Sequence, residues 1–270
     1  MSAPVIRIFS DLHFRDGESR LQHLAALAPL LDGADRIIFN GDTLDTQSPD
    51  TRSGLDEVRA YFAPFGSRAT FLSGNHDPDI SETAELSLLD DRVWITHGDV
   101  LFDHIAPWSA QRPELAARVA RFSAKLPPPD LARIETRLRI HRLACLGLAS
   151  LHPRAQRGTL AHLTRAAHTL AHPLRPLIML RVWQTTPALA RALARSQRPA
   201  ARLVVLGHTH YPGVWRHPAG PAVVNTGSFC PPFHNVYVEL IGERVRVIRP
   251  ELRSGEFRPG RVLADFPLAP

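Results

Sequence analysis

The chain has 270 residues, of which 44% are hydrophobic and 21% are charged, and its formal net charge is +6. This composition suffices for a large buried core and excludes a disordered polymer. No stretch approaches the ~18 uninterrupted apolar residues of a membrane span, and the first residues do not resemble a secretory signal. Two cysteines, Cys145 and Cys230, are too few for a disulfide framework. A reducing, cytoplasmic location is therefore expected.

Positive charge is concentrated in one internal segment. Between Val100 and Leu206 there are 17 Arg and Lys against 4 Asp and Glu, whereas the rest of the chain is net acidic. Such a segment favours an anionic partner, for example a phosphorylated substrate, a nucleic acid or an anionic membrane surface. A solvated helix surface that binds nothing is the alternative.

The first hundred residues alternate between strand and helix patterns. Short apolar runs predict strands at 4–10, 36–42, 69–77 and 92–99. Helical patterns lie between them, near 21–31 and 55–62. This alternation is typical of βαβ units around a buried sheet.

The pattern becomes helical over 105–201. Stretches rich in Ala, Leu and Arg, separated by proline-containing breaks, predict helices at 113–126, 130–143, 159–172 and 187–197. Strand patterns return at 202–210 and in the hairpin-like segments after it. We therefore predict an α/β sandwich of mixed sheets from 1–104 and 202–270, with 105–201 inserted as a basic helical cap.

Five predicted strands end in Asp, Asn or His, often beside glycine. The runs are DLH (11–13), GDTLD (41–45), GNHD (74–77), HGD (97–99) and GHTH (207–210). Ligands of open α/β sheets bind beyond the carboxyl ends of the strands, so these runs are expected to converge on one edge. Residues i and i+2 of an extended chain share a side, which predicts Asp11 with His13 and His208 with His210 as pairs.

The residue types indicate metal chemistry. Carboxylates, imidazoles and an amide oxygen, without thiolate, suit Mn, Fe, Zn or Co. Seven candidate ligands suffice for two divalent ions ~3.5–4 Å apart that share one carboxylate. They are Asp11, His13, Asp42, Asn75, His97, His208 and His210. Such a pair generates hydroxide and neutralises a reacting phosphate. His76 is then the general acid, and Asp45 is placed to orient its imidazole.

In this order, the five runs resemble the calcineurin-like metallophosphoesterase superfamily over about 1–104 and 202–240. The resemblance implies two divalent ions, with manganese the first candidate. It also implies two ligand sets that share a bridging Asp42: Asp11, His13 and His210 for one ion, and Asn75, His97 and His208 for the other. His76 and Asp45 would be the acid and its orienting residue.

Within the superfamily, the compact size, the HGD strand and the basic helices before GHTH look most like the UDP-2,3-diacylglucosamine hydrolases of lipid A synthesis. Those enzymes cleave a pyrophosphate, and they usually carry Arg where this chain has His76. The expected substrate is a similar lipid nucleotide, taken beneath the cap by a cytoplasmic protein with peripheral contact at the inner membrane. The alternatives are a nucleotide or nucleic-acid phosphodiesterase, whose phosphates the arginines would bind, and a non-catalytic scaffold.

Several residues near these runs are open to a structural interpretation. Asp77 and Asp99 are expected to fix loop backbones, whereas Asn225 either binds phosphate or positions the turn after it. The amphipathic, basic stretch 130–143 either packs within the cap or faces a lipid. Five histidines of the insertion are expected on helix surfaces: His141, His152, His162, His168 and His172.

Overall fold

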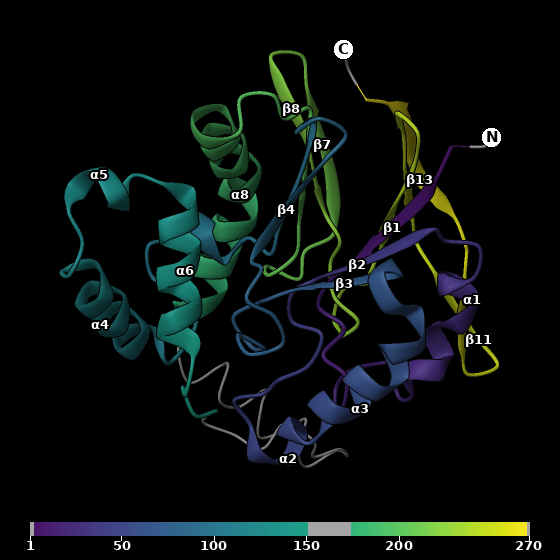
Figure 1. The fold of residues 1–270 in the computed structure, drawn as a ribbon, viewed down its shortest axis with the longest axis horizontal. Helices are drawn as coiled ribbons and strands as arrows, with labels where there is room; N and C mark the ends of the chain where they lie inside the picture. The colour runs from purple at the N-terminus through teal and green to yellow at the C-terminus, as the bar shows by residue number, and fades with distance from the viewer. Residues whose placement is uncertain (1–2, 151–173, 269–270) are drawn as a thin grey trace.

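Two β-sheets pack face to face between two layers of helices in the computed structural model, which describes residues 3–150 and 174–268 (Figure 1). Both sheets are mixed, because each combines parallel and antiparallel neighbours. The prediction of an α/β sandwich of mixed sheets is therefore confirmed.

The first sheet has six strands in the order β13-β10-β9-β1-β2-β3. Three parallel strands come from the N-terminal part of the chain: β1 (Val5–Phe9), β2 (Arg36–Asn40) and β3 (Ala69–Leu72). Three antiparallel strands come from its C-terminal part: β9 (Tyr237–Ile241), β10 (Arg244–Ile248) and β13 (Val262–Pro267). The central strand β1 thus pairs with β2 from the N-terminal part of the chain and with β9 from the C-terminal part. The sequence pattern alone does not indicate this pairing.

The second sheet has five strands in the order β4-β5-β6-β8-β7. Its members are β4 (Glu85–Leu88), β5 (Val93–Thr96), β6 (Leu203–Leu206), β7 (Gly213–His217) and β8 (Gly220–Asn225). Strands β5 and β6 are parallel neighbours although 106 residues separate their ends. The sequence analysis missed β4, β13 and the small hairpin of β11 (Glu251–Arg253) and β12 (Glu256–Arg258). All four are short or partly exposed, so they lack a long apolar run.

The sheets meet through a dry layer of aliphatic side chains. Ile8, Ile38, Ile95, Val205 and Val238 are fully buried there. On its other face, the six-stranded sheet is covered by helices of the N-terminal part: η1 (Leu24–Leu27), α1 (Ala28–Leu31), α3 (Gly54–Phe62) and η2 (Ala63–Arg68). The short α2 (Pro49–Arg52) precedes α3 and contributes no residue to this core cluster. Burial on both faces explains why these strands read as continuous apolar runs.

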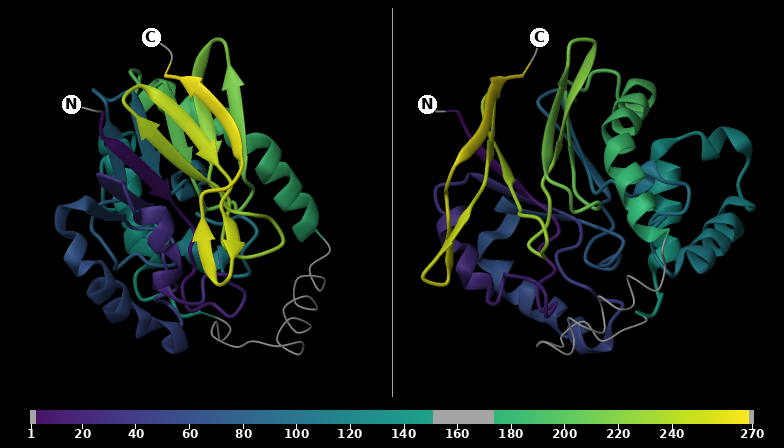
Figure 2. Two further views of the ribbon diagram at one scale, coloured as in Figure 1. Left: turned by 90° about the vertical axis from the view of Figure 1, so that its right-hand side faces the viewer. Right: turned by 180° about the vertical axis from the view of Figure 1, so that it is seen from behind.

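The helices between β5 and β6 form the opposite outer layer, visible from behind in Figure 2. After the short η3 (Asp99–Leu101), they are α4 (Arg112–Ser123), α5 (Pro128–Leu131), α6 (Ile134–Cys145) and α8 (Arg175–Gln197). Ile134 and Leu138 of α6 and Ala190 of α8 share one core cluster with Trp94 of β5. The apolar side of α6 therefore packs on the sheet. The domain boundaries at 104/105 and 201/202 remain predictions.

One helix prediction is wrong about where the helix begins. The helix predicted at 187–197 begins at Arg175, and Pro187 lies inside it. Proline removes one backbone hydrogen bond but does not end a helix whose flanks are held by packing. The predicted helix 159–172 lies outside the described residues. No helix within 3–150 and 174–268 is both long and apolar enough to cross a membrane.

Candidate metal centre

The carboxyl ends of strands from both sheets meet at one site. Loops after β1, β2 and β3 supply side chains from the six-stranded sheet, and loops after β5 and β6 supply them from the five-stranded sheet. Two groups have ligand atoms within 4.8 Å of one another: Asp11, His13 and His210, and Asp42, His97 and His208. The seventh predicted ligand, Asn75, places its Oδ1 3.3 Å from Nε2 of His97. All seven candidates therefore lie together, although their roles as ligands remain predictions.

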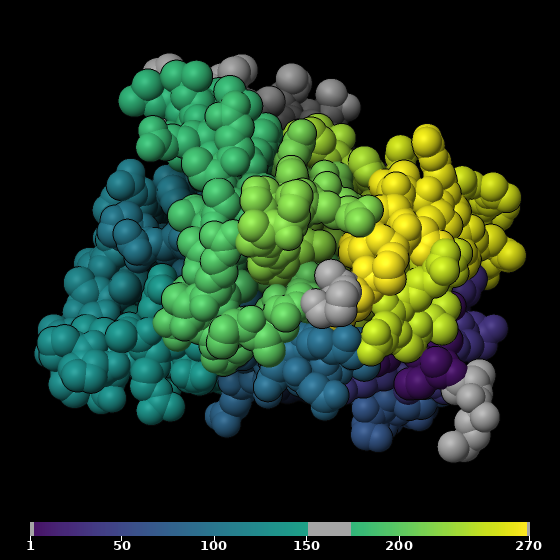
Figure 3. Space-filling view, turned by 90° about the horizontal axis from the view of Figure 1, so that it is seen from above, coloured from purple at the N-terminus to yellow at the C-terminus, as the bar shows by residue number. Residues whose placement is uncertain are grey.

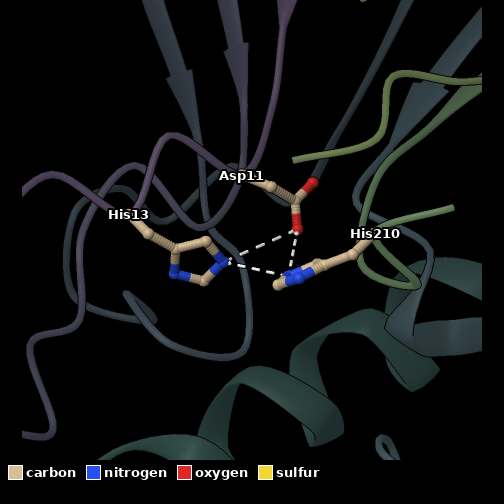
Figure 4. A group of neighbouring side chains, drawn as sticks. All are labelled: Asp11, His13 and His210. Atoms are coloured by element: carbon tan, nitrogen blue, oxygen red, sulfur yellow. Dashed lines mark hydrogen bonds and ion pairs between the residues drawn. The ribbon is translucent and has the colours of Figure 1, made fainter. Parts of the chain in front are cut away.

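The first group converges on a single point (Figure 4). The Nε2 atoms of His13 and His210 are 3.0 Å apart. Oδ1 of Asp11 lies 3.2 Å from Nε2 of His210 and 3.9 Å from Nε2 of His13. Asp11 and His13 are buried, whereas His210 is partly open to solvent. Two imidazole nitrogens and a carboxylate oxygen that face one another form a suitable donor set for a divalent ion.

The second group shows which nitrogen of each ring is available. Nδ1 of His97 lies 3.0 Å from the carbonyl oxygen of Asn40. A carbonyl only accepts, so Nδ1 carries a hydrogen, and Nε2, 3.1 Å from Oδ2 of Asp42, is the nitrogen that a metal would use in place of a proton. By the same reasoning Nε2 of His208 donates to the carbonyl of Ile105 at 2.9 Å, which leaves Nδ1 for a metal.

Burial keeps two of the rings neutral. It lowers the pKa of His13 to about 3, with a further contribution from the adjacent His210. It also lowers the pKa of His208 to about 4, and the charge of His97 adds to this effect. Neutral imidazole is the form that binds metals, so both rings are ready to act as ligands at neutral pH.

The carboxylates stay ionised for electrostatic reasons. Burial is the largest influence on Asp42 and would raise its pKa, but the charges of His97, His76 and His13 and the hydrogen bond with His97 together hold that pKa well below the usual range. Burial alone would lower the pKa of His97, but Asp42, with smaller contributions from Asp11 and Asp99, raises it well above its usual value. Burial would likewise raise the pKa of Asp11, which the hydrogen bond with His210 and the charges of His97 and His210 together lower instead. The site thus holds buried negative charge for which a cation would compensate.

The loops that carry these side chains are strained. Five candidate ligands have φ between 46° and 67°, a region that non-glycine residues rarely adopt: Asp11, His13, Asp42, His208 and His210. Asp11 and His13 do converge, but not because the chain is extended, so the reason given for their pairing is wrong. His208 and His210 belong to different groups, so the prediction that they act as one pair is also wrong.

Glycines let these loops pack against the carboxylates. A Cβ at Gly74 would lie 2.2 Å from Oδ1 of Asp42, and one at Gly207 would lie 2.1 Å from Oδ2 of Asp11. Glycine is therefore required by close packing at these two positions, which agrees with their place in the sequence pattern.

His76 and Asp45 form a separate pair at the edge of the site. Nδ1 of His76 is 3.1 Å from Oδ2 of Asp45, which is buried, while His76 is partly exposed. The other oxygen of Asp45 accepts the backbone N–H groups of Gln47 and Ser48, at 2.9 and 3.1 Å. The carboxylate is thus fixed, and its hydrogen bond with Nδ1 orients the imidazole of His76.

Neighbouring polar residues hold the loops. Asp77 accepts backbone N–H groups of Asp42, Thr43 and Gly74 at 2.7–2.9 Å, as expected. Asn225 donates to the carbonyl of Gly207 and accepts from Gly227, so it positions the turn.

His141 corrects one of the sequence-based expectations. It is buried rather than on a helix surface, and its Nδ1 lies 3.1 Å from Oδ2 of Asp99. Asp99 therefore ties α6 to the loop after β5. The other four histidines predicted on helix surfaces, from His152 to His172, lie outside the described residues.

A cavity of about 360 Å³ opens beside the two groups. His76, Asn75 and His208 line one side of it. The lining also includes the apolar side chains of Trp108, Leu115, Leu148, Met179 and Trp183, together with Arg175. The sequence analysis did not select these lining residues, because nothing in their spacing indicates that they meet.

A two-sheet α/β sandwich with carboxylate and histidine groups at its strand ends defines the metallophosphoesterase class. Residues 4–212 match the calcineurin-like phosphoesterase family, and the chain belongs to that family. The donor set described above fits the divalent metal ions that the family name implies: nitrogen and oxygen ligands around buried negative charge.

Three solved structures are similar to the chain at low sequence identity. Vacuolar protein sorting 29 from Cryptosporidium parvum is 14% identical with a TM-score of 0.44, over 99% of this chain and 100% of that one. A predicted phosphoesterase from Streptococcus pneumoniae is 15% identical with a TM-score of 0.42, over 99% of both chains. A dimetal phosphatase from Danio rerio is 12% identical with a TM-score of 0.44, over 100% of both. No curated protein matches the chain.

Substitution of Gly207 by alanine tests how tightly the site is packed. The new Cβ would collide with Asp11 and Ser10, both buried, so we expect a loss of about 1–3 kcal/mol in the free energy of unfolding and less bound metal. Gly54→Ala is the matched control, because the nearest atom to its Cβ belongs to the flexible side chain of Arg15. Denaturant unfolding and metal analysis measure both effects. Wild-type stability and metal content in Gly207→Ala would contradict the close packing.

Proposed function

We propose that the protein is a dinuclear-metal-dependent phosphoesterase that hydrolyses a phosphoester or pyrophosphate bond, with manganese as the first candidate metal. The observation that carries this proposal is the pair of adjacent ligand groups with His76 beside them in one cavity. Asp42 and Asp11 supply the carboxylates, and four histidines with Asn75 complete the set that would hold the ions. When bound, two such ions supply hydroxide near neutral pH and neutralise phosphate charge.

The chain's own residues then handle the leaving group. Nε2 of His76 donates a proton to the leaving oxygen, which lowers the barrier to P–O cleavage. Asp45 accepts the hydrogen bond from Nδ1 and so keeps the ring in the orientation that places Nε2 in the cavity. Residues of the helices α4, α6 and α8 line the same cavity and would limit the access of water to a bound substrate.

We propose a UDP-2,3-diacylglucosamine-like lipid nucleotide as the substrate. The apolar wall formed by Trp108, Leu115 and Met179 supports it, because a lipid chain requires such a surface beside the phosphate site. Arg175 adds positive charge to the same wall, which suits an anionic headgroup.

Peripheral contact with an anionic membrane surface is part of this proposal. Three leucines at the start of α8, Leu174, Leu177 and Leu180, are 48–68% exposed. Arg175 and Arg181 stand among them. Exposed leucine beside arginine is typical of helices that lie at a membrane interface. A vesicle-binding experiment tests the contact with the inner membrane. The cytoplasmic location is likewise part of the proposal.

A comparison of three substrates tests the proposal. The manganese-loaded protein would be given UDP-2,3-diacylglucosamine, bis-p-nitrophenyl phosphate and a short single-stranded oligonucleotide. We expect kcat/KM for the lipid nucleotide to exceed the others by more than ~10²-fold, because only that substrate uses the apolar wall. Met179→Lys should reduce this preference, whereas Leu189→Lys, an exposed position on the same helix, should not.

The other outcomes separate the alternatives. Activity on the diester or the oligonucleotide alone would overturn the lipid substrate and favour a nucleotide or nucleic-acid phosphodiesterase. No activity on any of the three, with metal bound, would favour a non-catalytic scaffold.

A further inference from the structure

Three aromatic side chains stand in a row next to the candidate metal centre. The rings of Trp183 and Tyr211 stack with centroids 5.0 Å apart and an angle of 19° between them. Trp215 continues the row, with its centroid 6.4 Å from that of Tyr211. Phe233 meets the first two rings edge-on, at 5.2 Å from each. Trp183, Tyr211 and Trp215 line a surface groove of about 470 Å³ between α8 and β7.

The rings of this aromatic row are held in place. Nε1 of Trp183 donates a hydrogen bond to the carbonyl oxygen of Thr209 at 3.0 Å. The ring of Trp215 lies against the backbone of Gly213, where an added Cβ would approach it to 2.5 Å. A platform fixed before a ligand arrives loses little conformational entropy on binding.

The groove and the cavity at the metal centre share one lining residue. Trp183 lines both the groove and the cavity that contains His76, His208 and His210. Tyr211 directly follows the candidate ligand His210 in the sequence. Figure 3 shows α8 and the β7–β8 hairpin side by side at the surface. A molecule in the groove is therefore close enough to be linked to a phosphate in the cavity.

We propose that this groove binds the nucleobase of a nucleotide substrate whose phosphate reacts at the metal centre; the inference rests on the proposed function and specifies its substrate class. A planar base stacks on aromatic rings whatever its identity. Tyr211 is 36% exposed and offers a surface for this contact. An acyl chain would gain from the apolar area but not from ring stacking.

Polar groups in the groove suit the edge of a base. Gln184 lines the groove, and its amide makes no hydrogen bond to any of the described residues. An amide carries both donors and an acceptor, the combination that recognises base edges. Arg191 donates to the carbonyl oxygens of Trp215 and Pro221, at 2.8 and 3.2 Å, and so fixes the end of the groove.

Two ligands that differ only in the base test this inference. Calorimetry on the manganese-loaded protein would compare UMP with ribose 5-phosphate, which lacks the base. We expect UMP to bind about tenfold more tightly, because one stacked base contributes roughly that much. Tyr211→Ala should remove most of this difference, whereas Tyr211→Phe should retain it. Leu189→Ala, on the same helix but outside the groove, is the control.

Three results would overturn the nucleobase subsite: equal affinity for the two ligands, no binding of either, or a difference in affinity that Tyr211→Ala leaves unchanged. This readout is separate from hydrolysis. A base-dependent difference in a protein that hydrolyses none of the three substrates would leave the subsite standing and overturn the phosphoesterase. The reverse combination would overturn only the subsite.

Discussion

Asp42→Ala is expected to weaken binding at both candidate metal positions and to abolish hydrolysis. Asp42 lies beside His97 in one ligand group. Its negative charge also acts on the pKa of His13, which belongs to the other ligand group. Loss of the shared carboxylate should lower affinity by more than the ~10–100-fold that loss of an outer-shell partner costs. Metal analysis after dialysis, together with calorimetry, measures the two occupancies.

Asp79→Ala is the matched control for this experiment. Asp79 lies on a neighbouring loop, but its carboxylate pairs with Arg52 rather than with the histidines. It should keep wild-type metal content. Full occupancy of two ions in Asp42→Ala would rule out the bridging role, and loss of only one ion would assign Asp42 to a single position.

His76→Ala is expected to lower kcat by ~10²–10⁴-fold, the usual contribution of a general acid, with both metals retained. His76 is bound to Asp45 and is not part of either ligand group. Activity and metal content would be measured on the same sample. His217→Ala, at an exposed histidine in the β7–β8 turn, should change neither. Loss of metal together with activity would show that His76 is a ligand instead.

A double-mutant cycle separates the role of Asp45 from that of His76. If Asp45 acts only by orienting the imidazole, the single substitution Asp45→Ala should lower kcat. The same substitution should lower kcat little further when His76 is already alanine. Additive losses would show that Asp45 acts by another route. Thermal unfolding of all three variants checks that the buried carboxylate is not simply needed for folding.

The structure also accounts for part of the positive charge between Val100 and Leu206. Arg142 of α6 donates to the carbonyl oxygens of Pro78 and Ser81, at 2.7 and 3.0 Å, in the loop that follows Asn75 and His76. Arg137 donates to the carbonyl of Val100 at 2.9 Å. These arginines brace the loops of the site. Residue counts cannot distinguish such arginines from arginines that bind a substrate, because both have the same composition.

Much of the site was predictable from the sequence because its information is local. Each candidate ligand directly follows an apolar run, and glycine marks the points where backbone and carboxylate pack closely. Buried parallel strands produce such runs, and their carboxyl ends are where ligands bind. The strands that carry the site, the seven candidate ligands and the His76–Asp45 pair could therefore be identified without coordinates, whereas β4, β11, β12 and β13 could not.

The pattern of strands and strand ends did not by itself decide which side chains meet. The ligand groups combine loops from two different sheets, so Asp11 joins His210, and His208 joins Asp42, a grouping that only the family resemblance had implied before the tertiary structure showed it. His141 is buried because α6 packs on the loop that contains Asp99. Trp183 stacks on Tyr211, although the two residues lie in different segments of the chain. Contacts between distant segments depend on how whole layers pack, and single-sequence periodicity reports only which face of an element is apolar.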